Sequence, residues 1–410
     1  MLKGNKSLLM VACKMGVIEC ARVLLDHNAD INYRTYNHDS ALKCACLSGN
    51  LDMLRLIIER GVTINDVVIA KLFESEELVR NTGIATILVG YIQNVNIEGQ
   101  FNCLLYSACR AGNAAIACLL IERGALLLYV YYDPLEAASR NGHLEVVTVL
   151  LGHYTVEVPV YQERIRQALL YASEGGHAEV LRCLIAHGLN ADTVALNSSL
   201  FQAVKEHHVE VAAALLDAGA DFDALIHHVL ASRQSHADDG FWSSWIYACR
   251  QGRPDMVRLL LARGADPNPA VAIGFSPLEA ILLHPDALRV LLEHGADPNR
   301  LSNGCTALLD LVRYQRGDYM QAITVLLENG ADVNLMDATT GQTALMIAAV
   351  ERNVDIVKLL LEYGADVTQV NREGKSVLDM LGRTRKYSEV AELCTQYIDS
   401  NKPGAKLLLK

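Results

Sequence analysis

The clearest hydrophobic pattern in the chain lies between residues 341 and 366. A short turn leads through Thr343 into an apolar run over 344–349, which predicts a first helix. After a polar break, apolar residues recur at helical spacing over 354–361 and predict a second, amphipathic helix. Gly364 follows, where a helix commonly ends in the left-handed conformation.

The same turn, helix pair and closing residue recur along almost the whole chain. The closing residues, most of them glycines, stand at Asn28, Gly61, Ile92, Gly124, Tyr154, Gly188, Gly219, Gly264, Gly295, Gly330 and Gly364. The usual interval is about 33 residues, which predicts a stack of repeats. In such a stack each repeat covers the apolar face of its neighbour.

Three stretches match the ankyrin pattern closely. They are the run D-P-L-E-A-A-S-R-N-G-H-L-E-V-V over 133–147, Ser276-Pro277-Leu278, and L-L-E-H-G-A-D-P-N ending at Asn299. On these residues the chain resembles the ankyrin-repeat proteins over nearly all of its length. The resemblance implies an all-α fold, an ankyrin-repeat solenoid of about eleven helix-turn-helix repeats with hairpin loops and a C-terminal cap, arranged as a curved, elongated stack.

The interval between Gly219 and Gly264 is longer than the others, which predicts a break in the stack. We expect an N-terminal ankyrin stack over 1–223 with about seven repeats, the third of them degenerate. An irregular insertion over 224–240 follows, and then a C-terminal stack with its end cap over 241–400. Residues 401–410 are predicted to form a tail.

Composition fits this architecture. Apolar residues make up 51% of the chain and aromatic residues 6%, as expected for a core of Leu, Ala, Val and Ile. The formal net charge of −11 disfavours binding to nucleic acid or to anionic membranes and mildly favours a basic partner. No apolar stretch reaches the ~18 residues that a membrane span needs.

The 11 cysteines are predicted to pack rather than to bind metal. Four of them occupy the slot of the first helix where the pattern needs a small buried residue: Cys13, Cys46, Cys109 and Cys249. No C-x-x-C pair supports a structural zinc site. A thiol-rich core implies a reducing compartment, so we expect a cytoplasmic protein, or one in the host cytosol if it is a secreted effector.

Two motifs could carry chemistry. Gly374-Lys375-Ser376 resembles the end of a phosphate-binding loop, but position 369 is Gln where that motif needs glycine. His227, His228 and His236, with Asp238 and Asp239, could ligate a metal ion, but their spacing fixes no geometry. The cysteines occupy packing positions and provide no placed nucleophile. The sequence therefore predicts no enzyme, no cofactor and no metal.

A ladder of basic residues follows the small slot of the first helix in seven repeats: Lys14, Arg110, Arg140, Lys205, Arg250, Arg313 and Arg383. Such a ladder could grip an anionic ligand on the inner-helix face, which is the face formed by the first helices. The favoured interpretation is that these side chains pair with acidic residues across the stack.

We expect the chain to be a protein–protein interaction scaffold, because the resemblance implies a rigid stack that binds a partner through its hairpin tips and inner-helix face. The alternative is an adaptor or a secreted bacterial effector that recruits a substrate to a host enzyme such as a ubiquitin ligase. The partner would be a protein whose identity the fold does not reveal. We expect no nucleic-acid partner and a monomeric chain.

Three asparagines end L-L-x-x-G-A-D-x-N runs: Asn268, Asn299 and Asn334. These runs resemble the sites that the HIF asparaginyl hydroxylase accepts in animal ankyrin proteins. The resemblance implies hydroxylation at these residues if the chain meets that enzyme.

The predicted docking residues break the polar pattern of the hairpin tips. Tyr129, Tyr131 and Tyr132 occupy one connector, Pro159 and Tyr161 the next, and Phe241 and Trp242 are a second candidate at the start of a later repeat. Exposed apolar patches mark interaction sites, and Tyr and Trp dominate interface hot spots. The alternative is that the tyrosines cover the apolar edge of a neighbouring repeat.

Replacing Tyr129, Tyr131 and Tyr132 together with serine is expected to abolish partner binding, because aromatic side chains give large contact area at little entropic cost. The helical circular-dichroism signal and the melting temperature should stay nearly unchanged. A variant that binds as before, or that unfolds, would assign the tyrosines a structural role instead.

Overall fold

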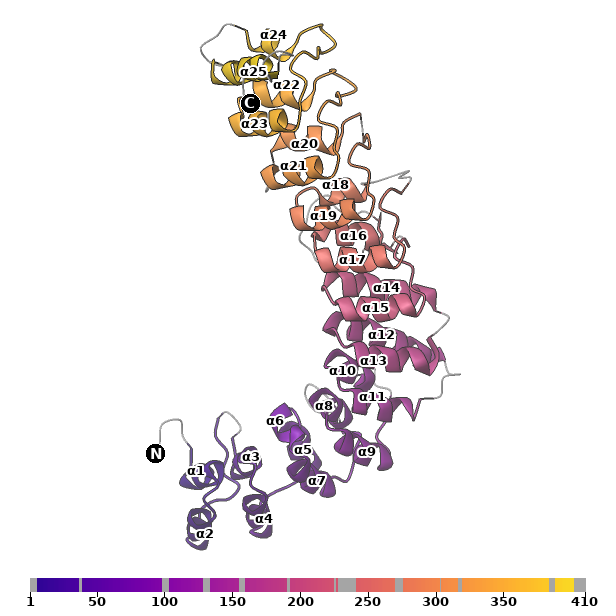
Figure 1. Ribbon diagram of the computed structural model, residues 1–410. Coiled ribbons are helices and arrows are strands. Elements are labelled where there is room, and N and C mark those ends of the chain that lie inside the picture. The colour runs from indigo at the N-terminus through magenta and orange to yellow at the C-terminus, as the bar shows by residue number, and fades with distance from the viewer. Residues whose placement is uncertain are drawn as a thin grey trace, which may run out of the picture. The chain divides into compact units, whose positions relative to one another are not determined.

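The fold is known from a computed structural model that describes residues 6–36, 39–97, 103–127, 133–154, 159–189, 192–224, 226–227, 241–269, 276–302, 304–315, 319–382 and 388–401. The chain divides into two compact units. The first comprises residues 1–202 with 217–219, and the second comprises 203–216 with 220–410. Within each unit, helices follow one another in pairs, and each pair lies on the one before it (Figure 1).

The first unit is built from short helices joined by turns: α1 Leu8–Met15, α2 Ile18–Asp26, α3 Ala41–Leu47, α4 Leu51–Glu59, α5 Asp66–Leu72, α6 Glu76–Arg80, α7 Thr82–Gly90, α8 Leu104–Ala111, α9 Ala114–Glu122, α10 Pro134–Arg140, α11 Leu144–Leu151, α12 Pro159–Gly175, α13 Ala178–Leu184, the π-helix Ile185–Leu189 and α14 Thr193–Lys205, whose last turn belongs to the second unit.

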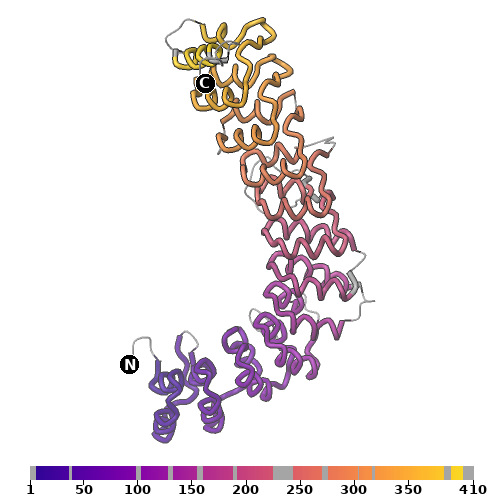
Figure 2. The backbone as a smooth tube through the Cα atoms, viewed as in Figure 1, coloured from indigo at the N-terminus to yellow at the C-terminus, as the bar shows by residue number. Residues whose placement is uncertain are grey.

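The second unit continues the pattern with α15 Val209–Asp217, α16 Ser244–Gln251, α17 Pro254–Ala262, α18 Pro277–Ile281, α19 Pro285–Glu293, α20 Ala307–Tyr314, α21 Tyr319–Glu328, α22 Ala344–Val350, α23 Val354–Glu362, α24 Val377–Leu381 and α25 Ser388–Asn401. Figure 2 shows the backbone winding through these pairs. Two short strands, β1 Ile226–His227 and β2 Phe241–Trp242, pair antiparallel. The predicted all-α repeat fold is confirmed.

First helices begin where the sequence supplies a capping residue. A serine or threonine side chain accepts a hydrogen bond from the third backbone N–H of the helix and so satisfies one of its unpaired donors. This cap stands before seven first helices, at Ser7, Ser40, Ser243, Ser276, Thr306, Thr343 and Ser376. In the structure, residues 374–376 form the turn before α24, and Ser376 is the N-cap of that helix.

The core lies between successive helix pairs. In the first two repeats Leu9 and Cys13 of α1 pack with Ala45 of α3 and with Met53 and Ile57 of α4. The four cysteines predicted to fill the small slot are buried: Cys13, Cys46, Cys109 and Cys249. Burial raises the pKa of Cys13 and of Cys46 to about 12, so both are neutral thiols that behave as small apolar side chains.

A second set of contacts between repeats is polar. His284, at the start of α19, lies with its Nε2 3.1 Å from the carbonyl oxygen of Arg250 in the preceding repeat. Because a carbonyl only accepts, Nε2 carries the proton and donates. His143 makes the same contact with the Arg110 carbonyl at 3.0 Å, and His177 makes it with the Arg140 carbonyl at 3.0 Å. These bonds fix how one repeat sits on the next.

The structure departs from the predicted repeats in two places. The degenerate third repeat contains three helices, α5, α6 and α7, instead of a pair. The prediction that Pro159 and Tyr161 lie in a connector is wrong, because α12 begins at Pro159 and includes Tyr161. Proline suits this position, since the first turn of a helix does not use its N–H groups. Most of the predicted insertion at 224–240 lies outside the described residues, so its role as a boundary stays a prediction.

In the described part of the chain, no helix is both long and apolar enough to cross a bilayer.

Gly252 ends α16 with a φ of 63°, and a Cβ there would lie 1.9 Å from Cγ of His284. We expect Gly252→Ala to cost ~1 kcal/mol for the left-handed backbone and a further ~1 kcal/mol because His284 must give up its hydrogen bond. Gly264→Ala is the matched control, because Gly264 has a φ of 94° and nothing within 4 Å of the added Cβ. Urea unfolding that gives equal losses for the two variants would contradict this role of His284.

Candidate functional site

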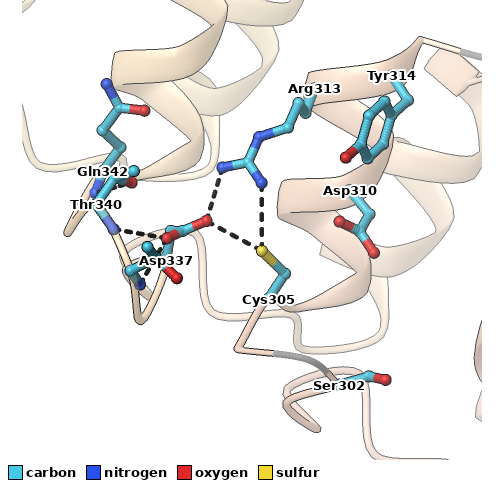
Figure 3. Close-up of a pocket in the computed structure, with 9 residues that line it drawn as sticks. Ser302, Cys305, Asp310, Arg313, Tyr314, Asp337, Thr340 and Gln342 are labelled. Atoms are coloured by element: carbon cyan, nitrogen blue, oxygen red, sulfur yellow. Dashed lines mark hydrogen bonds and ion pairs between the residues drawn. The ribbon is translucent and has the colours of Figure 1, made fainter.

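A polar pocket lies in the second unit, where a hairpin meets the first helix of the preceding repeat (Figure 3). Its volume is about 540 Å³. The residues that line it come from α20 and from the two hairpins beside it: Ser302, Cys305, Asp310, Arg313, Tyr314, Asp337, Thr339, Thr340 and Gln342.

Local structure places these side chains on one surface. Asp310, Arg313 and Tyr314 are three and four residues apart on α20, which puts them on the same face of the helix. The hairpin that leads to α22 is closed by an antiparallel bridge between Met336 and Thr343. This bridge holds Asp337 opposite α20, so the pocket is shared by two repeats.

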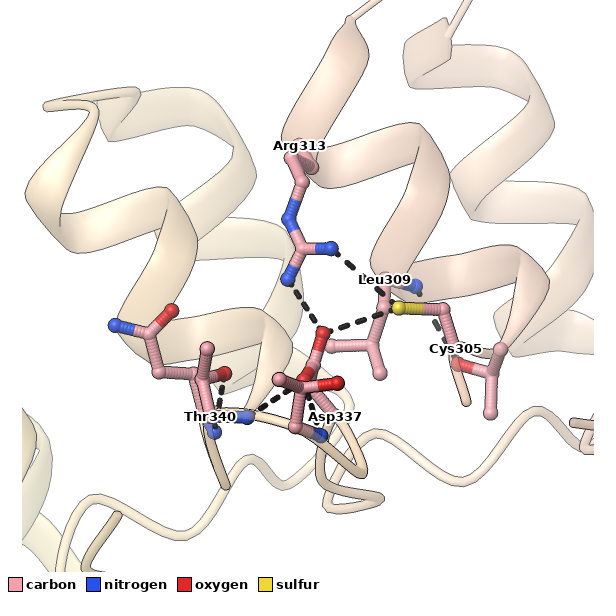
Figure 4. Close-up of polar contacts among 8 residues, drawn as sticks. Cys305, Leu309, Arg313, Asp337 and Thr340 are labelled. Carbon is pink, nitrogen blue, oxygen red and sulfur yellow. Dashed lines mark hydrogen bonds and ion pairs between the residues drawn. The ribbon is translucent and has the colours of Figure 1, made fainter. Parts of the chain in front are cut away.

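The pocket is organised by a buried carboxylate (Figure 4). Arg313 Nη2 donates to Oδ2 of Asp337 at 2.7 Å, and the Cys305 thiol donates to the same oxygen at 3.0 Å. The backbone N–H groups of Thr339 and Thr340 donate to Oδ1 at 2.7 and 2.8 Å. Both carboxylate oxygens are therefore satisfied, which matters because the Asp337 side chain is only 4% exposed.

These contacts set the charges in the pocket. Burial by itself would raise the pKa of the Asp337 carboxyl, but the hydrogen bonds from Arg313, Cys305 and the two backbone N–H groups outweigh it and hold that pKa well below its usual range. The bond to Asp337 also raises the pKa of Arg313. The two groups form a fixed ion pair, and Arg313 has little positive charge left to offer a ligand.

The groups that face the opening can bind but are not arranged for catalysis. Burial raises the pKa of the Cys305 thiol, and its bond to Asp337 raises it further, so the thiol is not an activated nucleophile. Burial also raises the pKa of the half-buried Asp310 carboxyl, against the effect of Arg313. Tyr314 is 58% exposed. The pocket thus offers a carboxyl group, a phenol and several hydrogen-bonding groups to a polar or basic side chain.

The basic ladder is used largely within the protein. Besides the Arg313–Asp337 pair, Arg110 forms an ion pair with Glu76 at 3.1 Å. Arg140 pairs with Glu136 at 3.3 Å and lies over the ring of Tyr171 at 4.0 Å. The pairs of Arg313 and Arg110 join neighbouring repeats, as the favoured interpretation predicts, whereas Arg140 pairs with an acidic residue of its own helix, α10. Arg383 lies outside the described residues.

The structure describes only some of the predicted docking residues. Tyr129, Tyr131 and Tyr132 lie outside the described residues. Phe241 and Trp242 are the two residues of strand β2. The ring of Tyr161, in α12, packs edge to face against Tyr154 with 4.5 Å between the ring centroids. This contact agrees with a structural role for Tyr161.

The three candidate modification sites are structural links between repeats. Asn268 Oδ1 accepts the N–H of Asp297 at 2.8 Å, and its Nδ2 donates to the Gly295 carbonyl at 2.7 Å. Asn299 bonds in the same way to Asp332 and Gly330, and Asn334 to Asp366 and Gly364. In each asparagine, both the amide oxygen and the amide nitrogen form a hydrogen bond to the next repeat. Hydroxylation at these residues stays a prediction.

Of the proposed metal ligands, His227 lies in β1, whereas His228, His236, Asp238 and Asp239 lie outside the described residues. Sequence analysis singled out Arg313 but missed Cys305 and Asp337, the two residues that it contacts. One sequence signal could have indicated this contact: Asp337 stands at a hairpin tip, and the preceding repeat carries the basic residue Arg313.

Asp337→Asn should destabilise the chain by about 2–3 kcal/mol at pH 7, because it removes a charged hydrogen bond to Arg313. Folding lowers the pKa of this carboxyl, so its contribution is complete above the unfolded pKa of about 3.9 and declines as the pH falls below that value. The stability gap between wild type and variant should therefore narrow from about pH 4 toward pH 2. Urea unfolding across this range measures it, with the exposed Asp355→Asn as control. A gap that does not change with pH would refute the ion pair's role.

Comparison with known proteins agrees with this architecture. The family model described as ankyrin repeats (3 copies) matches residues 2–67, 135–226, 245–337 and 308–403. Ankyrin repeat and KH domain-containing protein mask-1 of Caenorhabditis elegans is 27% identical over 64% of this chain and 10% of its own length. Potassium channel AKT2/3 of Arabidopsis thaliana is 30% identical over 36% of this chain and 17% of its own length.

Among solved structures, the ankyrin repeat domain of Bcl-3 is 23% identical, with a TM-score of 0.44 over 55% of this chain and 97% of that domain. The chain spans only about a tenth of the length of the C. elegans relative. The repeat pattern, the helix pairs and the family match, which covers more than half of the residues, show that this chain belongs to the ankyrin-repeat family.

Proposed function

We propose that this chain binds a partner protein in the groove between its hairpin tips and its inner-helix face. Ankyrin repeats are protein–protein interaction domains, and proteins of this family are typically scaffolds without enzymatic activity. The observation that carries the proposal is the polar pocket at this groove, which α20 and the neighbouring hairpin form together.

The chemistry of the pocket supports a basic or hydrogen-bonding side chain on the partner. Arg313 is neutralised by Asp337, so the carboxyl of Asp310 is the group on α20 that can attract a cation. The net charge of −11 favours the approach of a basic segment. At the neighbouring hairpin tip, Leu301 is 58% exposed and adds apolar contact area. A lysine or arginine flanked by an apolar residue would meet all of these groups.

The tyrosines at 129, 131 and 132 remain a proposed second contact, in the first unit. A partner that touches both units would gain affinity from two linked contacts, provided that its own geometry allows both at once. The adaptor or effector role stays an open alternative, since it requires a second partner in addition to the first.

Site-specific photocrosslinking tests the proposal. We expect Tyr314→p-benzoylphenylalanine to capture a protein of one discrete mass from the cells that express the chain. The same probe at Lys358, which is exposed on the second helix α23, is the matched control and should capture none. Asp310→Arg in the Tyr314 probe variant should reduce the crosslink at least fivefold, because it replaces an attraction for a basic side chain with a repulsion.

Equal crosslinking from Tyr314 and Lys358 would mean that the groove is not the binding surface. A crosslink at Tyr314 that Asp310→Arg leaves unchanged would keep the groove as the surface but contradict the basic partner.

A further inference from the structure

A second pocket lies in the first unit, between two successive first helices, α12 and α14 (Figure 1). We call it the α12–α14 pocket, and its volume is about 490 Å³. Its lining residues all belong to the first unit, so it is separate from the polar pocket of the second unit. The lining includes residues of α12 and residues at the start of α14: Glu163, Arg166, Leu170, Asp192, Val194 and Ser199.

The pocket lies where the repeat pattern changes. α12 has 17 residues and α14 has 13, whereas the first helices of the other repeats have five to eight. In the preceding repeat, Asp133 caps α10 and His143 precedes the second helix. The same spacing counted back from His177 reaches Gln167, which lies inside α12 instead of at its start. α12 therefore continues as a helix where a regular repeat has a hairpin, and its extra turns form one wall of the pocket.

Among the described residues, the charged groups of the pocket are two carboxylates and one guanidinium. Arg166 donates from Nε to Asp192, and from Nη1 to Oε2 of Glu163 at 3.2 Å. The hydrogen bonds from Gln167 and Arg166 hold the pKa of Glu163 below its usual value, and those from the Ala195 N–H and Arg166 do the same for Asp192. Both carboxylates are therefore ionised at neutral pH. The one positive charge offsets only one of the two negative charges.

One buried hydroxyl of the pocket has no hydrogen-bond partner. Ser199 is 1% exposed, and its Oγ makes no hydrogen bond to any described residue. Ser173 of α12 shows the usual arrangement, because its Oγ donates to the Leu169 carbonyl at 2.8 Å. An unpaired buried hydroxyl is costly, so a ligand that pairs with Ser199 gains from it. Other buried serines of first helices are unpaired as well, but of these four only Ser199 lines either of the two pockets: Ser107, Ser139 and Ser244 do not.

Apolar side chains from the two helices complete the pocket. Leu170 of α12 is half-buried, and Val194 of α14 is 74% exposed. The side chains of lysine and arginine have an apolar stem and a charged end, and the stem commonly lies along apolar surface while the end stays at a polar site. The pocket offers both kinds of surface to one such side chain.

We infer that the α12–α14 pocket binds an arginine or lysine side chain of a partner protein. The stem of this side chain would pack on Leu170 and Val194. Its charged end would lie against Glu163 and donate a hydrogen bond to the Ser199 hydroxyl. An acidic side chain would be repelled by the excess negative charge, and an apolar one would leave the hydroxyl unpaired. The inference rests on the proposed function, because it assumes a protein partner, but it concerns a different unit of the chain.

The probe is a biotinylated glycine–serine peptide that carries one arginine between two leucines. A second peptide has citrulline in place of the arginine, which keeps the shape of the side chain and removes its charge. The full chain with Val194→p-benzoylphenylalanine is irradiated with each peptide at physiological ionic strength, which screens the charge of the rest of the chain. We expect the arginine peptide to crosslink with at least five times the yield of the citrulline peptide.

Two changes in the probe variant test the two polar contacts. Glu163→Gln should lower the yield of the arginine peptide at least threefold. Glu179→Gln is its matched control, because Glu179 pairs with an arginine three residues on, as Glu163 does, but lies on α13 outside the pocket. Ser199→Ala should also lower the yield about threefold without lowering the melting temperature, since it removes a hydroxyl that has no partner. Ser173→Ala should do the reverse, because it breaks a hydrogen bond outside the pocket.

Equal yields from the two peptides, or no crosslink from either, would overturn the inference, and so would a Glu163→Gln variant that crosslinks as its parent does. A lower melting temperature for Ser199→Ala would show that the hydroxyl is already paired in the free protein, which also contradicts the inference. Val194 reports only on the first unit. Each of these results therefore leaves the crosslink at Tyr314, in the second unit, as a separate test of the proposed function.

Discussion

No repeat of this chain can bury its own apolar face, and the whole structure depends on neighbouring repeats doing so. The helices are short; α18 and α24 span five residues each. Isolated helices of this length are not stable in water, because nucleation costs more than a few hydrogen bonds return. Stability therefore lies in the interfaces between repeats, where residues such as Cys13 and Ile57 are fully buried. A change in one repeat is felt by its neighbours first.

Apolar contact sets the strength of these interfaces, and polar contacts set their register. His284 and Asn299 show the two forms of the polar contact, one at the start of a second helix and one in a hairpin. Each bonds to the backbone of an adjacent repeat. A slip by one residue would break these hydrogen bonds, so they favour one register of the stack. These side chains therefore link one repeat to the next.

In the polar pocket, a polar contact between two repeats lies at a surface that a partner can reach. The Arg313–Asp337 pair joins two repeats and at the same time removes a positive charge from the groove. What remains for a partner is the carboxyl of Asp310 and the ring of Tyr314.

Much of this protein could be determined from the sequence. The period of about 33 residues, the capping serines and threonines, and the small slots filled by cysteine are local signals, and each specified an element that the structure contains. Local signals failed where the hairpin pattern was weak, as at Pro159, which begins a helix instead of lying within a connector.

Only the tertiary structure decided which side chains meet. Arg313 lies 24 residues from Asp337, and Asn299 lies 33 residues from Asp332. Periodicity places such residues in neighbouring repeats but does not say which way their side chains turn. Arg313 pairs with Asp337 instead of facing a ligand because two backbone N–H groups hold the buried Asp337 carboxylate in position. The ion pair forms only once two repeats have packed together, because one repeat supplies Arg313 and the next supplies Asp337.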